Sequence, residues 1–233
     1  MVLLAFPASQ PYRAVADPPG GTDMTNHPFG LRRPHVAVGP ERLLALGDAV
    51  FSIAMTLLAL DITVPDGLPE TEVADAVAEA VPTIGAYLLS FFVIGTLWLV
   101  QHGLFRLIAT LDRWLLLLYF ALLATVAALP FPTRLISEYG ETTTATACYA
   151  GAIALAVALM CGMYVRLLVN PEAAAPQTSR TLLKVEIRHG VLLVLVFATS
   201  VPVAFYSPTL AKYWWLLAAG TRLLYRKPAD QEK

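Results

Sequence analysis

The segment from Glu41 to Pro65, ERLLALGDAVFSIAMTLLALDITVP, constrains this chain more than any other. It is long enough to cross a bilayer as a helix, because the hydrocarbon core requires about 20 apolar residues. Between Leu43 and Leu60 it contains one charged residue, Asp48. A carboxylate inside a membrane-spanning helix is costly and by default marks a functional or assembly site. The sequence therefore predicts a membrane protein with a polar site in its first span.

The composition supports this class. Hydrophobic residues make up 57% of the chain and charged residues 14%, whereas soluble domains carry roughly 25% charged residues. So little charge cannot cover a soluble surface, and an integral membrane protein is expected. The sequence also has no basic stripe of the kind that binds nucleic acid, so a nucleic-acid partner is not expected.

The apolar runs predict an all-α membrane protein with six transmembrane helices, each near the length that a bilayer requires. The predicted spans cover residues 42–63, 81–104, 114–133, 145–166, 187–206 and 209–225. An acidic loop is expected at residues 66–79. Around a six-helix domain at 40–226, we expect a disordered cytoplasmic arm at 1–39 and a short cytoplasmic tail at 227–233.

The basic residues predict the orientation. With six spans, all of the 16 Lys and Arg residues except Arg134 and Lys212 fall on one side of the membrane. Loops that carry excess Lys and Arg face the cytoplasm. A multi-pass protein of the plasma membrane with both termini in the cytoplasm is therefore predicted.

The 3.6-residue period of a helix places two stripes side by side on the first span. The polar stripe consists of Asp48, Ser52 and Thr56, and the aliphatic stripe consists of Ile53, Leu57 and Leu60. On spacing alone, an aliphatic stripe usually faces lipid or a neighbouring helix. The residues by themselves therefore do not give the stripe a function.

A second set of polar residues lies near the predicted cytoplasmic end. Trp98 and His102 are four residues apart on the second span and share a face, at the depth of Arg42 and Asp48. Arg42 is about 120° from Asp48 on the first helix, so each is expected to pair with a neighbouring helix instead. Asp112 could join this set. A structural ion pair that fixes helix packing is the favoured interpretation, and a proton-carrying carboxylate is the alternative.

Sequence motifs of known chemistry are absent. There is no HExxH, GxSxG, phosphate-binding loop or CxxC motif, and no TVGYG-type selectivity filter. We therefore expect no enzymatic activity, and no cofactor or metal site.

The first span resembles the first helix of the bacterial transmembrane protein 175 potassium channels. That helix carries an R-x-x-x-F-S-D pattern followed by an aliphatic run. Arg42 and Asp48 match the charged ends of the pattern, whereas Leu46 and Gly47 stand in place of its Phe and Ser. Gly47 removes a hydroxyl group, so either a water replaces that group or the polar cluster is looser in this chain.

Two further segments carry the same resemblance. YLLSFFVIGTLWLVQHGLFRLI is similar to the W-x-x-H-H region of the family, with Trp98 and His102 matching and Gln101 in place of the first His. ALPFPTRL at 128–135 resembles the L-P-F-x-T end of the third helix. The resemblance extends over about residues 41–136, whereas the C-terminal half is similar mainly in hydropathy.

The resemblance implies a homotetrameric, potassium-selective leak channel in the lipid bilayer, with K⁺ as the permeant ion and the first helices lining the pore. The aliphatic stripe then forms three stacked rings that can gate by dewetting. Thr56 lies one turn from the narrowest ring. The residues implied to support this helix are Arg42, Asp48, Trp98 and His102. The alternatives are a proton-coupled transporter that uses Asp48 and His102, and a non-conducting membrane scaffold.

Overall fold

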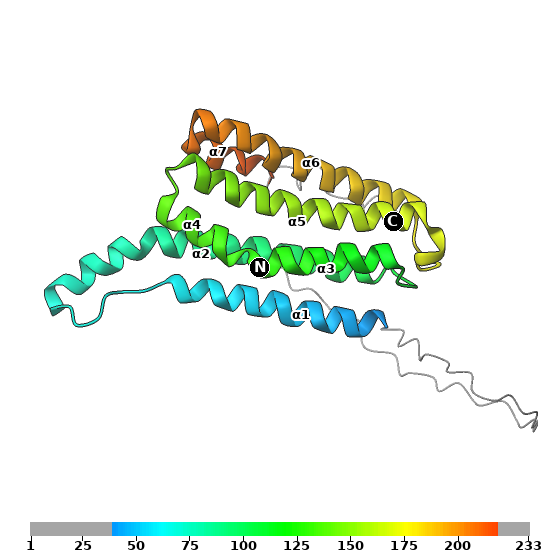
Figure 1. The fold of residues 1–233 in the computed structure, drawn as a ribbon, viewed down its shortest axis with the longest axis horizontal. Helices are drawn as coiled ribbons and strands as arrows, with labels where there is room; N and C mark the ends of the chain where they lie inside the picture. Colours follow the sequence, from blue (N-terminus) through cyan, green and yellow to red (C-terminus); the bar gives the residue numbers. More distant parts are fainter. Residues whose placement is uncertain (1–38, 219–233) are drawn as a thin grey trace, which may run out of the picture. The chain divides into compact units, whose positions relative to one another are not determined.

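The structure, a computed structural model, describes residues 39–218, and every element in this range is helical (Figure 1). The elements are α1 (Pro40–Leu57), the 3₁₀ turn η1 (Leu58–Asp61), α2 (Glu70–Phe105), α3 (Arg113–Ala128), α4 (Pro130–Tyr139), α5 (Thr143–Val169), the 3₁₀ turn η2 (Pro171–Ala173), α6 (Arg180–Tyr206) and α7 (Pro208–Trp214). The predicted all-α class is therefore confirmed for this part of the chain.

Five helical segments of the described chain are long and apolar enough to cross a membrane. They are Pro40–Asp61, Glu70–Phe105, Arg113–Tyr139, Thr143–Val169 and Arg180–Tyr206, and they contain most of the first five predicted spans. The sixth predicted span begins with α7, and its end lies outside the described residues. The predicted tail and the predicted arm, apart from residue 39, lie outside them too.

The prediction of an acidic loop at residues 66–79 is wrong for most of that range, because α2 begins at Glu70. Figure 1 shows the first turns of α2 extending beyond the neighbouring helices. Alanine and glutamate favour helix, and Glu70 and Glu72 lie in the first turn, where negative charge stabilises the helix dipole. Hydropathy detects only the apolar part of a helix. It therefore did not detect the polar first turns of α2.

The third predicted span is interrupted at Leu129, between α3 and α4. Pro130 has no N–H, so it cannot donate to the carbonyl group four residues earlier. The amide of Leu129 instead bonds to the carbonyl of Val126 at 3.1 Å, three residues back. Pro130 then occupies the first turn of α4, a position that tolerates proline.

The helices pack in the order seen in Figure 1, with α1 against α2 and α3, α3 against α5, and α5 against α6. One face of α1 is buried in this arrangement. Its buried residues, including the first of η1, are Leu43, Gly47, Phe51, Ala54 and Leu58. They recur at three- and four-residue intervals, as expected for a helix that packs along one side.

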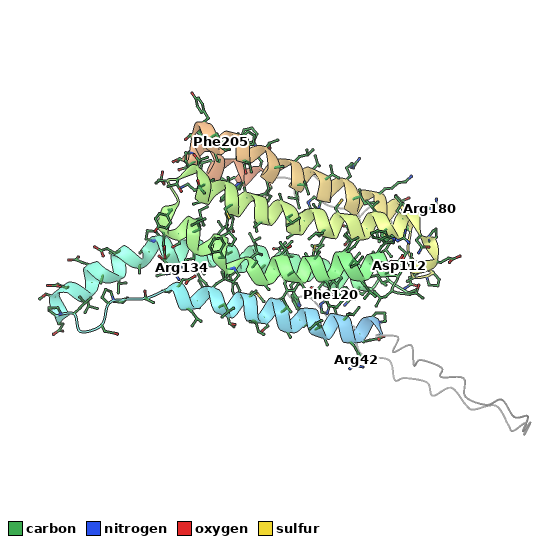
Figure 2. All side chains as sticks on the ribbon, viewed as in Figure 1. Arg42, Asp112, Phe120, Arg134, Arg180 and Phe205 are labelled. Atoms are coloured by element: carbon green, nitrogen blue, oxygen red, sulfur yellow. The ribbon has the colours of Figure 1, made fainter. Side chains whose placement is uncertain are left out.

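Charged residues gather at the two ends of the helices. Figure 2 shows Arg42, Asp112 and Arg180 toward one end and Arg134 at the other. This distribution matches the one from which the orientation is predicted. Asp112 also connects two helices at its end, because Oδ1 accepts a hydrogen bond from the Leu115 amide at 2.8 Å and Oδ2 lies 2.6 Å from Arg166 Nη2.

We predict that Asp112→Ala destabilises the protein more than Asp112→Asn. Alanine removes the cap of α3, which is worth about 1 kcal/mol, together with the ion pair to Arg166. Asparagine keeps an oxygen that can cap the helix. The measurement is the thermal unfolding temperature in detergent, and equal effects of the two variants would contradict the role of the cap.

The ion pair also predicts a pH dependence. Burial opposes ionisation, but the hydrogen bonds from Leu115, Arg166 and Asn170 outweigh it and hold the pKa of Asp112 below its ordinary value. A carboxyl with a lowered pKa stabilises the folded state above its unfolded pKa, at about pH 4 for aspartate. This contribution is lost as the pH falls further. The difference in unfolding temperature between wild type and Asp112→Asn should therefore shrink below about pH 4.

Candidate functional site

The aliphatic stripe of the first helix lies on the face of α1 that stays exposed among residues 39–218. The exposed fractions are 58% for Ile53, 42% for Leu57 and 70% for Leu60. Leu60 lies in η1, where the helix is wound more tightly than in α1. The first helix therefore packs along one side and leaves these three large aliphatic side chains exposed along the other.

Thr56 lies between the stripe residues and is also exposed. Its hydroxyl is positioned to donate to the backbone of its own helix, 2.9 Å from the Ile53 oxygen and 3.1 Å from the Ser52 oxygen. Such local bonding satisfies a threonine hydroxyl where water is scarce. The hydroxyl oxygen keeps acceptor capacity on the exposed side of the helix.

Asp48 forms a compact cluster with two residues of α2, as shared depth and helical spacing predict. The indole Nε1 of Trp98 donates to Asp48 Oδ1 at 2.8 Å, and His102 Nδ1 lies 3.7 Å from the same oxygen. The rings of Trp98 and His102 are 5.0 Å apart between centroids. These three residues are called the Asp48 cluster below. The side chain of Asp48 is nevertheless 43% exposed in the single chain.

Arg42 and Asp112 lie near the membrane depth of Asp48 in the sequence-based prediction, but neither residue is part of the Asp48 cluster. Arg42 is exposed, and no ion pair joins it to Asp48 within residues 39–218. The six-residue separation explains this, since it places the two side chains on different faces of α1. Asp112 is engaged at the start of α3, where it binds Arg166. Its possible membership of the cluster is therefore a wrong prediction.

Gly47 is the site of a close contact that the sequence does not reveal. The Gln101 amide donates to the Tyr119 hydroxyl at 2.8 Å, and that hydroxyl donates to the Leu43 carbonyl of α1 at 2.9 Å. A Cβ at position 47 would overlap the Tyr119 hydroxyl oxygen and lie 2.5 Å from Gln101 Nε2. We call Gly47, Gln101 and Tyr119 the Gly47 contact.

The Gly47 contact corrects the expectation of a water or a looser cluster at this position. Side chains from α2 and α3 fill the space instead, and Gln101 and Tyr119 are both completely buried. Tyr119 sits in the apolar run LLLLYFALL, where a tyrosine looks like an ordinary packing residue. The useful signal is the combination of a glycine and a buried glutamine on adjoining helices.

A second buried polar cluster joins α2, α4 and α5. Thr133 Oγ1 donates to Ser90 Oγ at 2.9 Å, and Ser90 Oγ lies 3.1 Å from the Tyr149 hydroxyl. All three residues are buried. Among the described residues, no group of three or more His, Cys, Asp or Glu side chains could hold a metal ion. The contacts of Ser90, Thr133 and Tyr149 connect three helices to one another.

Together, these features define a helical membrane protein whose first helix is held by buried polar contacts and carries an open aliphatic stripe. Residues 42–130 match the family described as "Endosomal/lysosomal potassium channel TMEM175". The matched region forms α1, α2 and α3, so this part of the chain is similar to TMEM175 channels. This confirms the resemblance found in the sequence.

Two relatives are similar to part of this chain. The chain is 42% identical over 98 residues to a potassium channel of Streptomyces collinus, covering 42% of this chain and 48% of that protein. It is 38% identical over 109 residues to the endosomal/lysosomal proton channel TMEM175 of Gallus gallus, covering 43% of this chain and 22% of that protein. The chain thus spans about half the length of the first relative and less of the second.

The fold is shared with a crystal structure of a lysosomal potassium-selective channel TMEM175 homolog from Chamaesiphon minutus. The TM-score is 0.70 at 24% sequence identity, and the match covers 81% of this chain and 98% of that chain. The likeness therefore includes helices beyond the region matched by the family.

We predict that Trp98→Phe lowers the stability of the protein, because it removes the N–H group that binds Asp48. A hydrogen bond to a charged group is worth about 1.5–3 kcal/mol, and the partial exposure of Asp48 reduces the expected loss to about 1 kcal/mol. Thermal unfolding in detergent measures the effect, with Trp114→Phe on the exposed side of α3 as the control. The loss should shrink in an Asp48→Ala background, and an undiminished loss would contradict the assignment.

Proposed function

We propose that this protein is a potassium-selective leak channel of the plasma membrane that assembles as a homotetramer around α1. The main support is the exposure of the aliphatic stripe of α1 in a chain whose residues 42–130 match a channel family. Relatives named potassium channels give the permeant ion. Conduction of K⁺ in this way requires no cofactor.

In the proposed assembly the four α1 helices surround an axis. Each of Ile53, Leu57 and Leu60 then contributes one side chain to a ring of four. Rings of large aliphatic side chains exclude water when they are narrow, so they can close a pore by dewetting. Thr56 stands between the levels of these rings and presents its hydroxyl oxygen beside the path of the ion.

In this proposal, the polar contacts on the buried side of α1 hold the helix in position. The pore on its other side can then fill with water and empty without moving the helix. The Asp48 cluster fixes α1 to α2 near the end that carries Arg42. We assign this end to the cytoplasm, because most of the basic residues share it and such residues favour the cytoplasmic side. Arg42 is exposed there and is proposed to support α1 through a neighbouring copy.

A proton pathway is the second candidate. It is favoured by the 3.7 Å approach of His102 to Asp48 and by vertebrate relatives named proton channels. The two candidates separate in one experiment on proteoliposomes, with K⁺ flux and internal pH recorded in parallel. Loss of proton flux in Asp48→Asn with K⁺ flux retained would favour the proton pathway.

We predict that Ile53→Asn increases K⁺ flux into proteoliposomes several-fold, because an amide in the ring holds water where the isoleucines exclude it. Leu195→Asn is the matched control, since it places the same polar group on an exposed position of α6. Unchanged flux in polar variants of Ile53, Leu57 and Leu60 alike would overturn the assignment of the stripe to the pore.

We further expect the purified protein to have the mass of four chains in mild detergent, measured by light scattering with the detergent contribution subtracted. The exposed stripe requires partners if it lines an axis. A monomer that persists in lipid nanodiscs would contradict an axial pore built from α1.

A further inference from the structure

We infer that the Gly47 contact is the element that sets the position of α1, and so the geometry of the aliphatic stripe. This inference rests on the proposed function and extends it to three positioning residues outside the pore. Gly47 supplies the space, Tyr119 binds the backbone of α1, and Gln101 holds the tyrosine in place. None of the three lies on the aliphatic stripe.

Two hydrogen bonds connect the Gly47 contact to the backbone of α1. Tyr119 donates to the backbone carbonyl of Leu43 in α1. The bond therefore holds the helix backbone itself and not only a flexible side chain. Gln101 donates to the same hydroxyl, and both side chains are fully buried. A buried bond that is broken leaves polar groups without water, so α1 cannot slide or turn here without an energetic cost.

The glycine makes this approach possible. With any Cβ at position 47, the Tyr119 hydroxyl oxygen could not occupy its place beside the Leu43 carbonyl. Tyr119 is itself held by Phe105, whose ring centroid is 4.8 Å away at a tilt of 62°. The tyrosine therefore has little room to withdraw, and a side chain at position 47 would push α1 away from α2 and α3.

The displacement would reach the stripe because α1 is one continuous helix from Pro40 to Leu57. Gly47 and Ile53 are six residues apart, which places them on different faces separated by about 120°. A helix pushed outward on its buried face moves its open face in the same direction. Ile53 and Leu57 would shift together relative to the remaining helices.

Two of the three departures from the family pattern within the matched helices meet at this point. Gly47 stands where the pattern has Ser, and Gln101 stands where it has His. The structure places the Gln101 amide nitrogen in the space that a side chain at position 47 would use. We therefore treat the glycine and the glutamine as a matched pair that acts through Tyr119.

The test is a mutant cycle of Gly47→Ala, Tyr119→Phe and the double variant in the full chain. Gly47→Ala should change K⁺ flux per folded oligomer by about tenfold, since overpacking a filled core costs enough to shift an equilibrium by that factor. Tyr119→Phe removes the hydroxyl and should have a smaller effect. The double variant should recover part of the wild-type flux. It removes the overlap with the hydroxyl oxygen, but the ring carbon stays 3.2 Å and Gln101 Nε2 stays 2.5 Å from the new Cβ.

Gly103→Ala is the matched control, because a Cβ at that position on α2 meets nothing within 4 Å. It should leave both flux and unfolding temperature unchanged. Wild-type behaviour of Gly47→Ala, or no recovery in the double variant, would overturn the inference. A fall in unfolding temperature with unchanged flux per folded oligomer would overturn the positioning role as well.

A readout that does not depend on conduction separates this inference from the proposed function. Spin labels at Ile53→Cys and Leu195→Cys, with Cys148 and Cys161 replaced by Ser, report the distance between α1 and α6 within spin-diluted chains. Gly47→Ala should shift this distance, and the added Tyr119→Phe should reduce the shift. If wild type carries no K⁺ flux, the channel proposal fails, while an unshifted distance overturns the role of the Gly47 contact.

Discussion

A polar group within the hydrocarbon layer has no water to bind, so its partner has to come from the protein. This constraint explains how the described helices are joined. Asp48 binds Trp98, the Leu43 carbonyl binds Tyr119, and Ser90 binds Thr133. Each bond connects helices that are distant in sequence. Apolar side chains fill the space between helices, and these polar contacts select one register among the many that apolar packing allows.

The contacts are distributed unevenly around α1. Its buried face meets α2 and α3 through both polar and apolar groups, whereas its other face presents the aliphatic stripe together with the exposed residues Ser52 and Thr56. The first face is suited to holding the helix in one place. The second can pack against itself across a symmetry axis without any polar group losing a partner. In the proposed channel, this division would keep the pore-lining face largely aliphatic while the buried face holds the helix in position.

Hydropathy and loop charge were enough to predict the class, the first five membrane segments and the grouping of charged residues at two ends. Periodicity placed Asp48, Trp98 and His102 at one depth, and the structure brings these three together. Other features could not be predicted, because they depend on which helices are neighbours. Asp112 has the right depth for the Asp48 cluster but binds Arg166. The start of α2 at Glu70 was missed because a polar helical extension does not change the hydropathy of the apolar run.

The close fit around Gly47 also makes the effect of one substitution depend on the residues at two other positions. A side chain at position 47 would overlap the Tyr119 hydroxyl oxygen and lie 2.5 Å from Gln101 Nε2. Position 47 therefore cannot gain a side chain without displacing side chains of α2 and α3. A contact of a few atoms thus couples the sequences of three helices.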